Sequence, residues 1–151
     1  MRKQADADRL SAYKFSGLHP VYPLDLTDYA QITTITFQIK EMVNSCKIPP
    51  LYSIINIAGS GQIAPIKLMN INAYRQEFEK RLVGPVAILQ ELLPLLRVTH
   101  GRIIWIATPG LLPVQYVADI HTSDFAVNYL ARTLNIELQP DGIHNILVHC
   151  G

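Results

Sequence analysis

The sequence predicts an α/β domain built around a mainly parallel β-sheet. Short apolar runs bounded by Gly and Pro alternate with stretches whose apolar residues recur at helical spacing, which is typical of βαβ units. The apolar runs are continuous, which favours strands buried on both faces. The chain has 151 residues, of which 49% are hydrophobic and 17% charged. We therefore expect a single domain over residues 1–151.

The first third of the chain is expected to contain a strand and a helix. His19–Leu24 is predicted to be a short strand, and residues 2–16 fit the end of a preceding helix. A helix is expected from about Asp28 to about Ser45, because Asp28 and Gln31 form a capping-box pattern. Its β-branched ITTITF run is a poor helix former, yet the apolar residues of the segment share one helical stripe.

Two further strands and two long helices are expected after this helix. The run LYSIINIAG follows Pro49 and Pro50 and predicts a central buried strand. A helix is expected over residues 73–97, capped by Asn72, and the run GRIIWIAT predicts the next strand. A helix over residues 119–139 should end at Pro140, and NILVHCG predicts a last strand.

Composition excludes several classes of function. A net charge of +1 with scattered Lys and Arg argues against a nucleic-acid partner. Cys46 and Cys150 are too far apart in sequence for a metal pair and too few for a disulfide framework, which favours a reducing compartment. The first residues lack a secretory signal, and no apolar run is expected to reach membrane-spanning length. The default expectation is an intracellular, cytoplasmic location.

Four segments carry a resemblance to a known family. PLDLTD contains Asp25, and the second segment is Asn56, Ile57, Ala58 and Gly59. The third and fourth are GRIIWIAT and the stretch from SDFAVNYL to the final HCG. In this order they resemble the short-chain dehydrogenase/reductase pattern. The resemblance implies a partial Rossmann-like, three-layer α/β/α fold that lacks the first β-α-β unit.

The resemblance also implies a degenerate catalytic set. It places Ile120 at the tyrosine that acts as general acid and Asp124 at the lysine that lowers the tyrosine pKa. Thr108 falls at the serine and Arg81 at the asparagine. Isoleucine cannot donate a proton, and aspartate puts negative charge where the mechanism needs a cation. The catalytic site is therefore expected to have no intact residue set.

Other polar residues near Ile120 are weaker candidates for proton chemistry. Tyr116 lies four residues earlier but has no Lys or Arg four residues after it. His121 points about 100 degrees away from Ile120 on a helix. Ser123 is expected to pack within the helix, because adjacent helical positions cannot form a serine triad.

Cofactor binding is expected to be impaired as well. Asp25, Asn56, Ala58 and Gly59 are the family's cofactor-binding positions in this chain. The glycine-rich turn that receives the pyrophosphate has no counterpart before Val21, and the Gly59–Gly61 segment lacks the spacing of a phosphate loop. We therefore expect no cofactor for this chain, and NAD(P) only if the missing unit is supplied.

Three functional hypotheses follow. The first is a non-catalytic dehydrogenase-like protein or fragment that acts as a homo-oligomer or with a protein partner, through helices 73–97 and 119–139. The chain also resembles a fungal group that lacks the catalytic Tyr and Lys and has Thr-Pro after the fifth strand, as Thr108 and Pro109 do here. Some of that group are associated with mitochondria. The alternatives are an NAD(P)-dependent oxidoreductase with a degenerate site and a truncated gene product without its own function.

Overall fold

The structure is a computed structural model that describes residues 4–12, 17, 19–108 and 113–150. It contains a parallel sheet of three strands in the order β1-β2-β3. The strands are β1 (Ser53–Asn56), β2 (Arg102–Ala107) and β3 (His144–His149). Ile55, Ile104 and Ile146 lie in one register row across them. The predicted α/β fold with a parallel sheet is confirmed, and all three of its strands were expected. The prediction that β1 is a central strand buried on both faces was wrong, because β1 lies at the edge of the described sheet and Ile55 is exposed.

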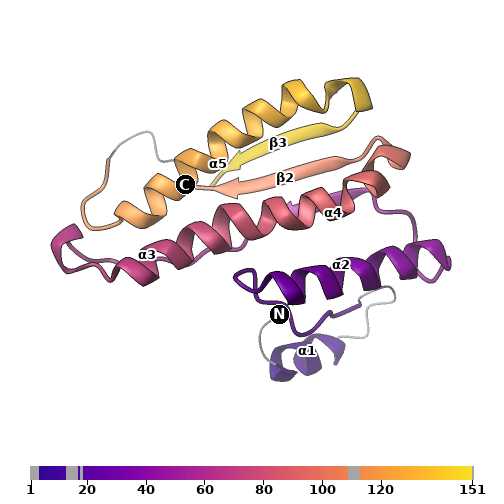
Figure 1. Cartoon of the computed structure of the whole chain (residues 1–151), viewed down its shortest axis with the longest axis horizontal. Coiled ribbons are helices and arrows are strands. Elements are labelled where there is room, and N and C mark those ends of the chain that lie inside the picture. The colour runs from indigo at the N-terminus through magenta and orange to yellow at the C-terminus, as the bar shows by residue number, and fades with distance from the viewer. Residues whose placement is uncertain (1–3, 13–16, 18, 109–112, 151) are drawn as a thin grey trace.

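Helices connect the strands and lie beside them (Figure 1). They are α1 (Gln4–Ser11), α2 (Tyr29–Asn44), α3 (Ile71–Phe78), the π-helix η2 (Glu79–Val83), α4 (Gly84–Thr99) and α5 (Ala118–Glu137), with short 3-10 turns η1 (Ile66–Leu68) and η3 (Gln139–Asp141). The α3, η2 and α4 segments follow one another without a break. They correspond to the single helix expected over residues 73–97.

The two helix starts differ in how well the sequence predicted them. Asp28 caps α2 by accepting hydrogen bonds from the backbone N–H groups of Ala30 and Gln31, as the capping-box pattern indicates. Asn70 caps α3 instead of Asn72, because its extended backbone lets its side chain accept from the amides of Asn72 and Ala73. The prediction of Asn72 as the cap was therefore wrong by two residues.

The strand predicted at His19–Leu24 is absent from the described part of the chain. The segment is not helical and belongs to no ladder, since the described sheet contains only β1, β2 and β3. A strand forms only where a neighbouring strand satisfies its backbone groups. Strand β1 lies at the sheet edge with β2 as its one described neighbour, so apolar composition alone was a misleading signal here.

The core lies on one face of the sheet. Ile103, Trp105 and Ala107 of β2 are buried there, and α4 and α5 contribute further buried core residues such as Leu96 and Val127. The Trp105 indole N–H donates to the Asn145 side-chain oxygen at 2.8 Å, so the buried polar groups pair across β2 and β3. Side chains alternate along a strand, so the neighbours of Trp105 point to the opposite face.

One helical segment passes the length and composition test for a membrane span. Ile71–Thr99 has 29 residues and a mean hydropathy of 1.4 in its most apolar window, which corrects the expectation that no segment would do so. A core helix of a folded domain can pass the same test. About 28% of its most apolar window is buried within the described chain, including Leu89, Leu92 and Leu96.

Candidate active-site region

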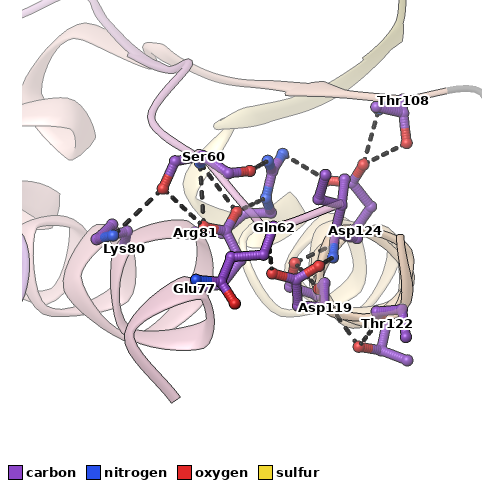
Figure 2. Close-up of polar contacts among 12 residues, drawn as sticks. Ser60, Gln62, Glu77, Lys80, Arg81, Thr108, Asp119, Thr122 and Asp124 are labelled. Atoms are coloured by element: carbon purple, nitrogen blue, oxygen red, sulfur yellow. Dashed lines mark hydrogen bonds and ion pairs between the residues drawn. The ribbon is translucent and has the colours of Figure 1, made fainter. Parts of the chain in front are cut away.

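Polar side chains from four segments meet at the carboxyl end of the sheet (Figure 2). The loop after β1 supplies Ser60 and Gln62, and Thr108 follows the end of β2. Helix α3 and the π-helix η2 supply Glu77 and Arg81, and the first turns of α5 supply Asp119 and Asp124. Carboxyl ends of parallel strands are where open α/β sheets bind ligands. We call Glu77, Arg81, Thr108 and Asp124 the ion-pair cluster.

Arg81 joins the two carboxylates of the ion-pair cluster. Its Nε lies 2.8 Å from Glu77 Oε1, and its Nη1 lies 2.8 Å from Asp124 Oδ1. The side chains of Glu77 and Asp124 are only 1% and 4% exposed, so neither carboxylate can rely on water for solvation. Buried carboxylates need a cation and hydrogen bonds to offset desolvation. Arg81 is therefore the charge that makes this arrangement possible.

Thr108 binds the second oxygen of Asp124. The backbone N–H of Thr108 donates to Asp124 Oδ2 at 3.0 Å, and the Thr108 hydroxyl donates to the same oxygen. Both carboxylate oxygens of Asp124 are thus engaged. The structure brings together three of the four predicted degenerate positions, Arg81, Thr108 and Asp124, in one bonded group.

The fourth degenerate position, Ile120, packs instead against the loop after β1. A Cβ on Gly61 would lie 2.2 Å from Ile120 Cγ1, so the side chain fills the space over that glycine. The preceding residue, Asp119, is fully buried and accepts from the backbone N–H groups of Gln62 and Ile120 at 2.8 Å each. The start of α5 is thereby tied to this loop through an apolar contact and a buried carboxylate.

The buried Glu77 also holds the loop after β1. Its two oxygens accept from the Ser60 backbone N–H at 3.0 Å, and one of them accepts from the Ser60 hydroxyl at 3.1 Å. Lys80 Nζ donates to that hydroxyl at 3.2 Å. With Arg81 also donating to Glu77, the carboxylate is fully engaged in hydrogen bonds.

A cavity of about 360 Å³ adjoins the ion-pair cluster. The segment that precedes α2 and the loop after β1 face each other across it, together with one residue of η2. Its lining consists of Leu24, Asp25, Leu26, Ala58, Gly59, Ser60 and Lys80. Three of the predicted cofactor positions, Asp25, Ala58 and Gly59, are therefore brought together. The fourth, Asn56, does not line the cavity, and its buried side-chain nitrogen lacks a hydrogen-bond partner among the described residues.

This region does not fit an intact dinucleotide. Arg81 occupies the space beside Gly59, where a Cβ would lie 2.3 Å from Arg81 Nη2. Asp124 puts a carboxylate beside the sheet edge where a ribose would need a cation. The described residues offer no glycine-rich turn for a pyrophosphate. We therefore derive no chemical step through NAD(P).

Several site residues were not expected from the sequence. Glu77, Ser60 and Asp119 carry the buried hydrogen bonds of the region, and Lys80 lines the cavity. The spacing of four residues between Glu77 and Arg81 was the one available signal, because such pairs meet on a helix. The contacts to Ser60 and Asp119 depend on the path of a loop, which spacing does not reveal.

None of the alternative proton donors has a side-chain hydrogen bond to the ion-pair cluster within the described part of the chain. Tyr116 has a left-handed backbone, with φ of 70°, and its ring is half exposed. Ser123 is fully buried and donates to the Asp119 carbonyl at 2.8 Å, which confirms the prediction that it packs within the helix. His121 is partly buried on α5.

The parallel sheet with a polar site at its carboxyl edge defines a Rossmann-like α/β protein. The profile of the family described as short chain dehydrogenase matches residues 7–151. The chain belongs to the short-chain dehydrogenase/reductase family, as its sequence motifs predicted.

Curated relatives are longer than this chain. It is 29% identical to the short-chain dehydrogenase PC-15 of Penicillium crustosum over 152 residues, which covers 100% of this chain and 51% of the relative. It is also 29% identical to human 11-beta-hydroxysteroid dehydrogenase type 2, over 85% of this chain and 31% of the relative. The chain thus spans about half the length of PC-15, and less of the human enzyme.

Solved structures show the same fold. A short-chain dehydrogenase/reductase from Saccharomyces cerevisiae superposes with a TM-score of 0.85 at 18% identity, covering 99% of this chain and 57% of that one. A metagenomic short-chain oxidoreductase in complex with NADP gives a TM-score of 0.82 at 20% identity, covering 100% and 68%. At these identities the similarity establishes the fold alone.

Proposed function

We propose that this chain is a non-catalytic member of its family that acts through protein association. The observation that carries the proposal is the ion-pair cluster, in which Arg81, Asp124 and Thr108 bond to one another where the family's resemblance places catalytic groups. Ile120 offers no proton at the expected position of the general acid. These groups stabilise the fold and leave no donor for proton transfer, a contribution that is typically worth about 10² to 10⁴ in rate.

The outward side of α5 supports the association part of the proposal. Phe125, Tyr129 and Ile136 are exposed and recur at helical spacing, and we call them the α5 surface. Tyr129 is 67% exposed, and the Arg132 guanidinium lies 5.8 Å from its ring centroid. Exposed aromatic and aliphatic residues beside an arginine are common in protein interfaces. We propose a second copy of this chain as the partner.

Sedimentation of the full chain over a range of concentrations tests this association. We expect concentration-dependent self-association that Tyr129→Asp weakens at least ten-fold, because a buried charge would face an apolar partner. Tyr29→Asp is the matched control, since Tyr29 is 66% exposed on α2, outside the α5 surface. A monomer at every concentration, or equal loss in both variants, would refute the proposed interface.

A second candidate function is NAD(P)-dependent hydride transfer. The cavity beside Asp25 and Gly59 favours it, because an adjoining unit could complete a cofactor site there. The metagenomic oxidoreductase with a similar fold was solved in complex with NADP, and that complex is a property of the metagenomic protein. The candidate requires a proton donor other than Ile120.

A further inference from the structure

The connection between β1 and α3 carries an exposed aliphatic patch. Ile63, Ile66, Leu68 and Ile71 are 81%, 67%, 71% and 62% exposed. Single exposed aliphatic residues are normal on a protein surface and need no explanation. Four of them within one short loop concentrate apolar surface in contact with water, which indicates an interaction site. We call these four residues the loop patch.

Backbone hydrogen bonds fix the loop that carries this patch. The Ala64 N–H donates to the Tyr116 carbonyl at 2.8 Å, so the segment before α5 lies beside the loop, at the end of the molecule where β2 ends (Figure 1). In the 3-10 turn η1, the Leu68 N–H donates to the Pro65 carbonyl at 2.8 Å. A backbone group that is bonded internally loses less free energy when it approaches an apolar phase.

The charged residues of the same segment are cations. Lys67 and Arg75 are the only charged residues in the sequence from Ile57 to Gln76, and both are exposed. Lys67 stands between two residues of the loop patch. Its flexible aliphatic stem lets the ammonium group reach a polar layer above an apolar one. The loop therefore combines apolar side chains with positive charge.

The neighbouring carboxylates do not cancel this positive charge. Glu77 and Asp119 are buried beneath the loop and accept hydrogen bonds from the backbone N–H groups of Ser60 and Gln62. Glu79 is exposed, but it lines a small cavity together with residues of α2. The surface around the loop patch is thus complementary to a negatively charged partner.

The size and charge of the loop patch favour a lipid surface over a protein. A stable protein interface takes about 20–30 residues on each side, which is far more than one loop supplies. Peripheral membrane binding depends on buried apolar area together with attraction between basic residues and anionic headgroups. We propose that the loop patch, with Lys67 and Arg75, docks this chain on a membrane surface that contains anionic phospholipid.

Vesicle flotation of the full chain tests the proposal. The probes are vesicles of phosphatidylcholine alone and vesicles of phosphatidylcholine and phosphatidylserine in equal parts. We expect binding to the mixed vesicles that Leu68→Asp weakens at least ten-fold, because the carboxylate would enter an apolar, negatively charged layer. Val98→Asp is the matched control, because Val98 is 77% exposed at the end of α4, outside the loop patch. Absence of binding to mixed vesicles, or an equal loss in both variants, would overturn the proposal.

Two further measurements separate the electrostatic and the apolar contributions. Replacing Lys67 and Arg75 together by Gln should weaken binding several-fold and reduce its dependence on salt concentration. Leu68→Trp places an indole in the loop patch, while the one native tryptophan, Trp105, is buried. Its fluorescence should shift to shorter wavelength on mixed vesicles. Unchanged emission of this variant would contradict insertion of the patch.

Other occupants of the patch would give different results. Equal binding to vesicles of phosphatidylcholine alone would remove the role of the cations and overturn the anionic-lipid proposal. Self-association that Leu68→Asp weakens, without vesicle binding, would identify a second copy of the chain as the occupant. Ile63→Asp is a second variant of the patch in case Leu68→Asp fails to fold. Tyr129→Asp should bind vesicles like the wild-type chain, so self-association through α5 and membrane docking can fail separately.

Discussion

The ion-pair cluster and the cavity beside it lie at the same edge of the sheet but are built differently. In the cluster, buried carboxylates are held by Arg81 and by backbone N–H groups, and each oxygen of Asp124 has a partner. In the cavity, Asp25, Ala58 and Lys80 line open space. The expected catalytic positions are thus filled by mutual contacts, while part of the expected cofactor region stays accessible. Two neighbouring parts of one sheet edge therefore differ in how far their polar groups are already engaged with one another.

The largest effect is expected from removing the cation of the cluster. Arg81→Met leaves Glu77 and Asp124 buried without a cation and should lower the free energy of unfolding by about 3–5 kcal/mol. Thermal unfolding should then occur about 10 °C lower. Arg97→Met is the control, because Arg97 also bonds Asp141 at 2.8 Å but is 51% exposed. It should cost about 0–1 kcal/mol. Equal losses of unfolding free energy in the Arg81→Met and Arg97→Met variants would show that the ion-pair cluster stabilises the chain no more than an exposed ion pair does.

A medium effect is expected at the contact between Ile120 and the loop after β1. Gly61→Ala should destabilise the chain by about 1–3 kcal/mol, because Gly61 has φ of 126° and the new Cβ would overlap Ile120. Adding Ile120→Ala should recover the steric part of this loss in chemical denaturation. Gly17→Ala isolates the backbone part, since Gly17 has φ of 94° and no described atom lies within 4 Å of the added Cβ. Lack of any rescue would contradict the packing described for Ile120.

The smallest effect is expected in the cavity. Lys80→Met removes one hydrogen bond to the Ser60 hydroxyl and no buried ion pair, so stability should change by no more than about 0.5 kcal/mol. Denaturant unfolding of the Lys80→Met and Arg81→Met variants compares the loss of unfolding free energy at these two neighbouring residues. A loss above about 2 kcal/mol for Lys80→Met would remove the distinction between cluster and cavity.

Sequence analysis predicted local features better than long-range ones. The Asp28 cap, the three strands and the long helices follow from periodicity and capping, which act within a few residues. The strand expected at His19–Leu24 is not formed, because strand pairing depends on a neighbouring strand that the described residues do not place there. The predicted positions Arg81, Thr108 and Asp124 lie far apart in sequence. Their mutual bonds depend on how α5 packs beside η2, which composition does not encode.

We propose that the ion-pair cluster and its surroundings exclude the family's hydride-transfer chemistry. Calorimetric titration of the full chain with NADPH and NADH, followed by a hydride-transfer assay of the same samples, tests it most directly. We predict no saturable heat in the micromolar range and no turnover with either nucleotide. Saturable micromolar binding accompanied by turnover that Thr108→Ala abolishes would contradict the account, because it would show a working active site at these residues.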